Sequence, residues 1–272
     1  MMSETYKGYR ELTGTTADIN EYMCAIKPGD FYVNEYLIIR NTDDGSESEM
    51  RWDGEKFNRL KLPPSKFVKA KNALQRCALD MLNTPSITVC AILGVAGGGK
   101  TYLIQNMAKY AVLEKGWQSR IVGIREYVSD SAAIGFLPGS RDDKLQDLFM
   151  PLADQLEGGE FELESLRQRG VLETTSPFFI KGRSLNDSYI ICEESEDLTE
   201  KQIRLIGTRV GQNSRICFNG DIKQASIKYK SQPGLIKMCN ALKGSPLFAT
   251  IWLTDDVRSE TSKLFTSISF EE

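Results

Sequence analysis

Apolar and polar residues follow one pattern in the first part of this chain of 272 residues and a different pattern in the remainder. From about residue 82 onward, short continuous apolar runs, typical of strands buried on both faces, alternate with stretches of helical periodicity. Strands are predicted over residues 87–93, 120–124, 189–192, 215–218 and 248–253. Helices are predicted from Lys100 onward, over residues 199–207 behind a capping box, and over about 234–242. This alternation predicts an α/β fold with a mainly parallel sheet between helices.

The first 64 residues have a different pattern, which predicts a small β-element. Residues 1–29 are polar and predict an arm or a short helix, whereas residues 31–40 predict a strand, followed by a possible strand pair around Asp53 and Gly54. Two prolines then punctuate the chain before a helix predicted over residues 65–82. We therefore expect an N-terminal arm and β-element in residues 1–64 and a core domain in residues 65–272. Residues 129–176 interrupt the alternation of strands and helices, which predicts an insertion with one or two helices.

Composition and charge exclude several classes of function. The net charge of −3 argues against nucleic-acid binding over a whole basic surface, so any such site must be a local patch. The chain has no histidine, which excludes Ser-His-Asp triads, Cys-His dyads and histidine metal sites. Its six cysteines form no C-x-x-C pair, which favours reduced thiols over disulfides or zinc. No apolar run is long enough to span a membrane, and the polar N-terminus lacks a signal-peptide pattern, so a cytoplasmic protein is expected.

The strand over residues 87–93 leads into the pattern G-x-x-x-x-G-K-[ST], which predicts a phosphate-binding loop. Glycines let backbone N–H groups crowd around phosphate oxygens, and the helix that follows presents its positive end to the anion. A lysine at this spacing reaches the β- and γ-phosphates, and the following hydroxyl contacts Mg²⁺. The alternative is a glycine-rich surface turn, which the buried strand and the helix disfavour. The predicted nucleotide-binding residues are Gly94, Val95, Ala96, Gly97, Gly98, Gly99, Lys100, Thr101 and Tyr102.

Two acids follow the buried run Tyr189–Cys192 and predict the catalytic chemistry. The ends of parallel strands meet at one edge of a sheet, so these acids should lie beside the phosphate loop. Glu193 would hold Mg²⁺ directly or through water, and Glu194 would polarise the attacking water. The alternative is a solvated acidic cluster that begins a helix, where acids suit the helix dipole.

Further candidates lie at other strand ends and helices. Asn219, Gly220, Asp221 and Gln224 follow the next strand and would sense the γ-phosphate, or would form only a turn and a helix cap. Arginines are the usual partners of transition-state phosphate charge, and the candidates are Arg209 and Arg258. The amide of Gln75 has a donor and an acceptor that would suit an adenine edge. Without other evidence, the alternative is an ordinary residue on the surface of a helix.

The order of these motifs resembles the PhoH family of P-loop ATPases, which is related to the core of superfamily-one helicases. The matching segments run from about residue 66 to residue 262. They are KAKNALQRCALDML, GVAGGGKTYLI, IGFLPGS, KGRSLNDSYIICEES, LTEKQIRLIGTRVGQNSRICFNGD and DDVRSE.

The resemblance implies a RecA-like domain with ATPase activity, a ring-shaped hexamer and action on RNA. It also implies that Gln75 reads adenine, that Lys100 and Thr101 are the phosphate-loop pair, and that Gly220, Asp221 and Gln224 sense the γ-phosphate. Arg258 would be an arginine near the phosphate, supplied in the same subunit or across a subunit boundary.

The chain departs from the family pattern at its acidic motif. The family usually reads D-E-A-Q where this chain has Glu193, Glu194, Ser195 and Glu196. Glu193 keeps the charge but adds a methylene, and Glu196 replaces an amide donor with negative charge, which predicts slow or regulated turnover. The compact size, the short β-element and the divergent motifs favour a phage-encoded member of the family, acting in the host cytoplasm.

Two functions remain open from the sequence alone. The first is a Mg²⁺-dependent ATPase that acts on RNA or another single-stranded nucleic acid as an oligomeric ring, with helicase activity as a further possibility within that ring. The second is a non-catalytic module in which bound nucleotide acts as a structural or assembly switch. Lys181, Arg183 and the insertion at 129–176 are the candidates for partner contact.

Overall fold

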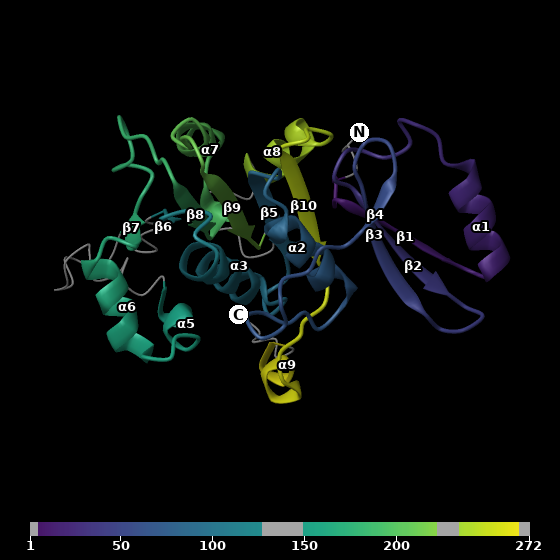
Figure 1. Cartoon of the computed structure of the whole chain (residues 1–272), viewed down its shortest axis with the longest axis horizontal. Coiled ribbons are helices and arrows are strands. Elements are labelled where there is room, and N and C mark those ends of the chain that lie inside the picture. Colours follow the sequence, from purple (N-terminus) through teal and green to yellow (C-terminus); the bar gives the residue numbers. More distant parts are fainter. Residues whose placement is uncertain (1–4, 127–148, 222–233, 267–272) are drawn as a thin grey trace, which may run out of the picture.

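The core of the protein is a six-stranded parallel sheet, seen edge-on in the middle of Figure 1. The computed structural model describes residues 5–126, 149–221 and 234–266. Within them the strand order is β10-β5-β9-β8-β6-β7, and every neighbouring pair is parallel. The bounds are β5 Val89–Gly94, β6 Arg120–Arg125, β7 Leu172–Thr175, β8 Ser188–Glu193, β9 Arg215–Gly220 and β10 Phe248–Leu253. The predicted α/β fold is thus confirmed, and the carboxyl ends of all six strands meet at one edge.

Helices cover both faces of this sheet (Figure 1). On one face lie α2 (Ala73–Asn83), α3 (Lys100–Lys109) with its π-helical extension η1 (Tyr110–Glu114), α5 (Met150–Ala153) and α6 (Gly159–Gln168). On the other face lie α7 (Glu200–Gly207) and α8 (Gly234–Leu242). The short η3 (Ser195–Asp197) follows β8, and α9 (Glu260–Thr266) follows β10. Among the described residues, none of the helices combines the length and apolar composition that crossing a bilayer requires.

A second, four-stranded sheet is built from the N-terminal residues and lies beside the core in Figure 1. Its order is β1-β2-β3-β4, with β1 parallel to β2 and the remaining pairs antiparallel. The elements are β1 Tyr9–Gly14, α1 Thr16–Ala25, β2 Tyr36–Asn41, β3 Glu47–Trp52 and β4 Phe57–Arg59. A small apolar cluster around Phe31, Trp52 and Phe57 fills the space between this sheet and α1. The predicted β-element is therefore present, with β1 as a strand that the polar N-terminal pattern did not reveal.

The N-terminal residues also cover the edge strand β10 of the core sheet. The Asn34 amide donates to the carbonyl oxygens of Pro246 and Phe248, at 3.1 Å each. The backbone N–H of Tyr6 donates to Asn240 Oδ1 at 3.2 Å. An exposed strand edge invites pairing with other chains, so this cover protects the core sheet from such pairing.

Two sequence expectations change with the structure. The helix predicted over 65–82 begins only at Ala73, because the Asn72 side chain caps it by accepting from the N–H of Gln75. The insertion around 129–176 was expected to lie outside the core, yet its described part supplies β7 and the buried side chains of Phe149, Leu152, Leu163 and Leu166. Its first part, residues 129–148, lies outside the described residues.

Candidate functional site

The loop between β5 and α3 has the backbone of a phosphate cradle. Gly94 and Gly97 have φ values of +136° and +79°, a region that residues with a Cβ rarely adopt. A Cβ at Gly94 would lie 2.0 Å from the carbonyl oxygen of Leu253, and one at Gly97 would lie 2.1 Å from Arg258 Nε. Glycine is therefore required at both positions, and the turn places the N-terminus of α3 at the carboxyl edge of the sheet.

Lys100 lies across this loop at the first position of α3. Its Nζ donates to the carbonyl oxygens of Gly94 and Val95, at 2.9 Å each. Burial lowers the pKa of Lys100, and the nearby carboxylates of Asp221 and Glu196 oppose that shift. The ammonium group is thus held over the loop by two neutral carbonyl acceptors. Negatively charged phosphate oxygens would be stronger acceptors and would replace them.

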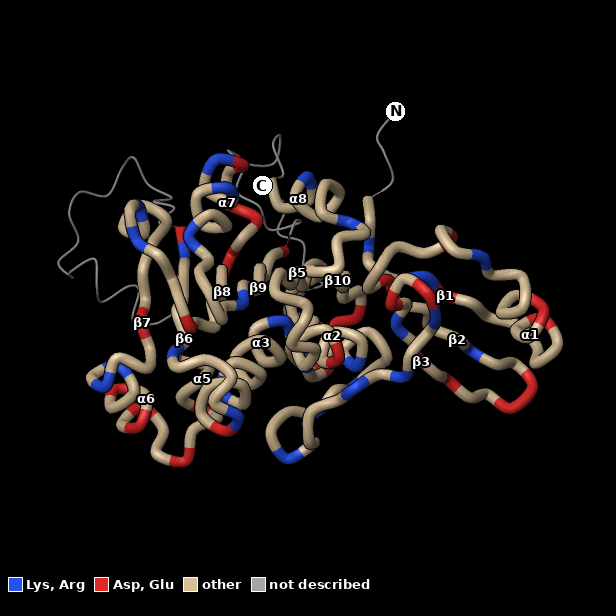
Figure 2. Tube along the Cα trace, turned by 45° about the horizontal axis from the view of Figure 1, so that its top comes forward, with Lys and Arg blue, Asp and Glu red and all other residues tan. Residues whose placement is uncertain are grey.

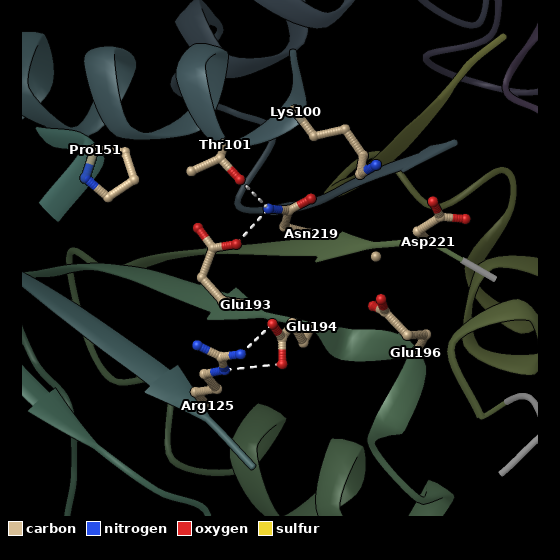
Figure 3. A pocket seen from close by; sticks show the side chains of 10 residues that line it. Lys100, Thr101, Arg125, Pro151, Glu193, Glu194, Glu196, Asn219 and Asp221 are labelled. Atoms are coloured by element: carbon tan, nitrogen blue, oxygen red, sulfur yellow. Dashed lines mark hydrogen bonds and ion pairs between the residues drawn. The ribbon is translucent and has the colours of Figure 1, made fainter. Parts of the chain in front are cut away.

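Thr101, Asn219 and Glu193 form a connected polar group from α3, β9 and β8. The Asn219 amide donates to Thr101 Oγ1 at 2.9 Å and also to Glu193 Oε2 (Figure 3). Burial raises the pKa of Glu193 to about 7, while hydrogen bonds from Asn219 and Gln105 oppose this shift. One carboxylate and one hydroxyl fit Mg²⁺, which keeps several waters and takes its other ligands from phosphate. Among the described residues no group of three or more acidic or cysteine side chains forms a complete protein cage for a metal.

Glu194 occupies a different environment from its neighbour Glu193. Its backbone is left-handed, with φ 49° and ψ 45°, and this turn directs its side chain away from that of Glu193 (Figure 3). Both of its carboxylate oxygens accept from Arg125, the last residue of β6, with Nε to Oε2 at 2.8 Å. Strained residues of this kind gather at functional sites, where the surrounding structure holds them in place.

All these groups surround one cavity of about 310 Å³ at the carboxyl edge of the sheet (Figure 3). Its lining residues are Lys100, Thr101, Arg125, Pro151, Glu193, Glu194, Glu196, Asn219, Gly220 and Asp221. Lysine and arginine face four carboxylates here, which suits the binding of an anion together with a cation. The structure thereby brings the predicted phosphate loop, metal group and base to one place.

Arg125 and Pro151 were not singled out from the sequence. Arg125 carried a usable signal, because it ends a predicted apolar strand in the same way that Glu193 ends β8. Pro151 lies in the described part of the insertion, and its place beside the cavity depends on the packing of α5 against α3.

Gln75 braces the phosphate loop in this structure. Its Nε2 donates to the carbonyl oxygen of Gly98 at 2.9 Å, and its Oε1 accepts from the N–H of Lys71 at 2.7 Å. The side chain is buried, so both ends of the amide are engaged with backbone. Adenine reading by Gln75 stays a prediction that requires the amide to exchange these partners.

Arg258 lies against the phosphate loop of its own chain. Its guanidinium pairs with Asp256, with Nη2 to Oδ2 at 2.7 Å, and donates to the carbonyl oxygen of Ala96 at 3.3 Å. The N–H of Val257 donates to the carbonyl oxygen of Gly97 at 3.0 Å. The segment after β10 therefore packs against the loop, and a role of Arg258 at the phosphate stays a prediction.

The remaining predicted residues lie elsewhere. Arg209 follows the end of α7, and its carbonyl oxygen accepts from the N–H of Leu185, just before the start of β8. This is the amino edge of the sheet, opposite to the cavity, so Arg209 does not join the other site residues within one chain. Tyr102 is 40% exposed on the first turn of α3. Gln224 lies outside the described residues.

Comparison with known proteins identifies the family. The sequence profile described as "PhoH-like protein" matches residues 67–269, which is most of the chain. This chain belongs to the PhoH family. The PhoH family relatives include Protein PhoH2 of Thermobispora bispora, 32% identical over 84% of this chain and 51% of that protein. Protein PhoH2 of Bacillus subtilis is 27% identical over 96% of this chain and 64% of its own length.

A "PhoH-like protein" of Bacillus subtilis is 34% identical over 61% of this chain and 53% of that protein. The chain therefore spans about half the length of the curated relatives it matches. The match supports a P-loop, nucleotide-binding member of the PhoH family with the fold described above.

Glu196 differs from the other acids of the cavity in its surroundings. Burial raises its pKa to about 7, and among the described residues its Oε2 has no hydrogen-bond partner. Because the shift is upward, the group is mostly neutral at pH 6 and mostly ionised at pH 8. A negative charge facing Lys100 across the cavity opposes the binding of phosphate at the higher pH.

We expect Glu196→Gln to strengthen Mg²⁺-free ATP binding about tenfold at pH 8 and to change it little at pH 6, since one pKa unit corresponds to a factor of ten. Binding is measured by isothermal titration calorimetry in EDTA, and the ratio of the two proteins cancels the titration of ATP itself. The exposed Glu160→Gln is the matched control. An equal ratio at both pH values would contradict the role assigned to the Glu196 charge.

Proposed function

We propose that this chain is a Mg²⁺-dependent ATPase. The observation that carries the proposal is the meeting of the phosphate loop, the Thr101–Asn219–Glu193 group and Glu194 at one cavity. Lys100 would hold the β- and γ-phosphates, and Thr101 and Glu193 would hold Mg²⁺, which would neutralise phosphate charge when bound. Glu194 would accept a proton from the attacking water, because its carboxylate lines the same cavity.

The proposal is tested by replacing the proposed base. We expect Glu194→Gln to lower the rate of ATP turnover by about a hundredfold or more while MgATP affinity stays within a few fold. Phosphate release and the binding of a fluorescent ATP analogue are measured on the same preparations, with Glu160→Gln on α6 as the control.

Two outcomes separate this proposal from its alternative. If the wild type releases phosphate no faster than Lys100→Ala, with or without single-stranded RNA, the ATPase proposal is lost. Tight MgATP binding without turnover, together with a nucleotide-dependent oligomer mass, would instead favour the nucleotide-binding switch.

We further propose that the ATPase acts on single-stranded nucleic acid, preferably RNA. The supporting feature is the aromatic pair of Phe178 and Phe179 on the segment after β7, and these two residues are 69% and 52% exposed. Lys181 Nζ lies 5.6 Å from the centre of the Phe178 ring. Exposed rings beside a cation suit base stacking next to a phosphate backbone. The charge of Arg183 is offset by a two-point pairing with Glu173.

The proposed nucleic-acid site is a local patch and not an extended basic surface. Acidic and basic positions are interspersed along the described trace in Figure 2, rather than gathered into a single basic face. Stacking on a few exposed rings therefore carries more of the proposed contact than long-range charge does.

We expect the double substitution Phe178→Ala and Phe179→Ala to weaken the binding of a short labelled RNA by about tenfold or more, because stacking contributes roughly 1–3 kcal/mol per base. Fluorescence anisotropy measures this, with ATP turnover in the absence of RNA as a check of folding. Phe161→Ala is the matched control, because that ring is 86% exposed on α6. Unchanged RNA affinity in the double variant would remove this contact from the proposal.

Assembly into a ring, with six subunits as the expected number, is also part of the proposal and rests on the family alone. Native mass spectrometry of the MgATP-bound protein tests it, and a stable monomer would count against both a ring and helicase activity.

A further inference from the structure

Arg125 and Glu194 form a two-point ion pair between neighbouring strands of the core sheet. Arg125 ends β6, and in the parallel register it lies opposite Glu193, one residue before its partner. Its Nε lies 2.8 Å from Glu194 Oε2, and its Nη2 contacts Oε1. Planar, two-point pairing of this kind is the strongest geometry available to an arginine and a carboxylate, and it fixes direction as well as distance.

This pair differs from an ordinary surface salt bridge. The two side chains are 36% and 47% exposed, so charge attraction alone contributes little to stability at this position. Both residues nevertheless line the cavity that holds Lys100, and Glu194 adopts a left-handed backbone that a residue with a side chain normally avoids. Glu194 thus combines an unfavourable backbone conformation with an ion pair that adds little stability. This combination points to a functional role of the pair in the cavity.

The ion pair also restricts the position of the Glu194 carboxylate. Glu193 is held in place by burial and by the Asn219 amide, whereas Glu194 reaches into solvent on a side chain with three rotatable bonds. Without a partner its carboxylate would occupy many positions, and a base must stay within hydrogen-bond reach of its water. The end of β6 is itself anchored, because Glu126 accepts from Gln202 on α7 at 2.5 Å.

We propose that Arg125 is the positioning residue of Glu194, an inference that rests on the ATPase function proposed above. A carboxylate has about four lone-pair sites, and a two-point arginine uses two of them, so two remain for the attacking water. The water oxygen bonds to the γ-phosphorus, the bond from that phosphorus to the ADP oxygen breaks, and the water proton passes to Glu194. Arg125 touches neither water nor phosphate in this arrangement, and it acts by holding the carboxylate still.

The test is a double-mutant cycle in which Arg125→Met and Arg125→Lys are made in the wild type and in Glu194→Gln. We expect Arg125→Met to lower kcat by about a hundredfold, the loss typical of a misplaced catalytic group, with KM and MgATP affinity within a few fold. Arg125→Lys should recover part of kcat. In the Glu194→Gln background Arg125→Met should have no further effect, because the carboxylate that it positions is already gone.

Arg40→Met is the matched control, since Arg40 also forms partly exposed ion pairs, with Glu11 and Glu47, but lies on β2, away from the cavity. An unchanged kcat in Arg125→Met would overturn the inference. So would an equal loss of MgATP affinity in both backgrounds, which would make Arg125 a phosphate ligand. Failure of the ATPase proposal gives a different result, namely a wild type that releases phosphate no faster than Lys100→Ala.

Discussion

Replacing Lys100 with alanine is expected to reduce ATP turnover by about a hundredfold to a thousandfold, the effect of losing one preorganised charge at a reacting phosphate. In the structure Lys100 Nζ spans the phosphate loop and contacts the carbonyl oxygens of Gly94 and Val95. Its removal takes away the cation that would meet the β- and γ-phosphates, so MgATP affinity should fall as well, by at least about tenfold.

Phosphate release and ATP binding are both measured, with circular dichroism to verify folding. Lys201→Ala on the exposed side of α7 is the matched control and should behave as the wild type. A Lys100→Ala variant that binds MgATP with wild-type affinity would remove this lysine from the nucleotide site.

Replacing Asp80 with alanine is expected to cost about 3–5 kcal/mol in the free energy of unfolding, as is usual when one partner of a buried ion pair is removed. Asp80 is fully buried on α2 and joins the N-terminal sheet to the core. Its carboxylate accepts from Tyr36 Oη at 2.9 Å, Arg51 Nε at 2.8 Å and the N–H of Lys61 at 2.6 Å. Alanine would leave the buried hydroxyl of Tyr36, the largely buried guanidinium of Arg51 and the N–H of Lys61 without this partner.

Urea denaturation followed by tryptophan fluorescence measures the loss, with Asp44→Ala as the control. Asp44 lies in the exposed turn after β2 and accepts from the N–H of Ser46, so its removal should cost less than about 1 kcal/mol. If the two variants unfolded at the same urea concentration, Asp80 would not be the link between the two sheets.

The sequence predicted the core sheet well because buried parallel strands leave a direct trace in the chain. The predicted strand 248–253 coincides with β10, and the predicted run 189–192 lies within β8. The four-residue strand β7 escaped notice because it lies in a polar segment and is recognised only by its pairing with β6. The start of α2 was predicted too early because the apolar periodicity was extended back to residue 65, although Asn72 with Gln75 three residues later resembles a capping arrangement, and Asn72 is the N-cap in the structure.

The candidate site was only partly predictable. Motif spacing identified Lys100 and Thr101, and the rule that strand ends meet at one edge identified Glu193 and Glu194. Arg125 was missed because a single arginine at a strand end has many surface explanations until its partner is known. Arg209 does not join the cavity within one chain because the eight-residue helix α7 carries the chain back to the opposite edge of the sheet, so its role stays a prediction.

The sequence by itself determined the fold class, the phosphate loop and the family, because each depends on local spacing and on apolar runs within a few residues of one another. Only the tertiary structure decided the different surroundings of the two adjacent acids. Glu193 and Glu194 are neighbours in the chain, yet burial and Asn219 hold the first toward Thr101, while a left-handed turn and Arg125 hold the second at the mouth of the cavity. These environments come from β6 and β9, strands distant in sequence that only the folded sheet places on either side of β8.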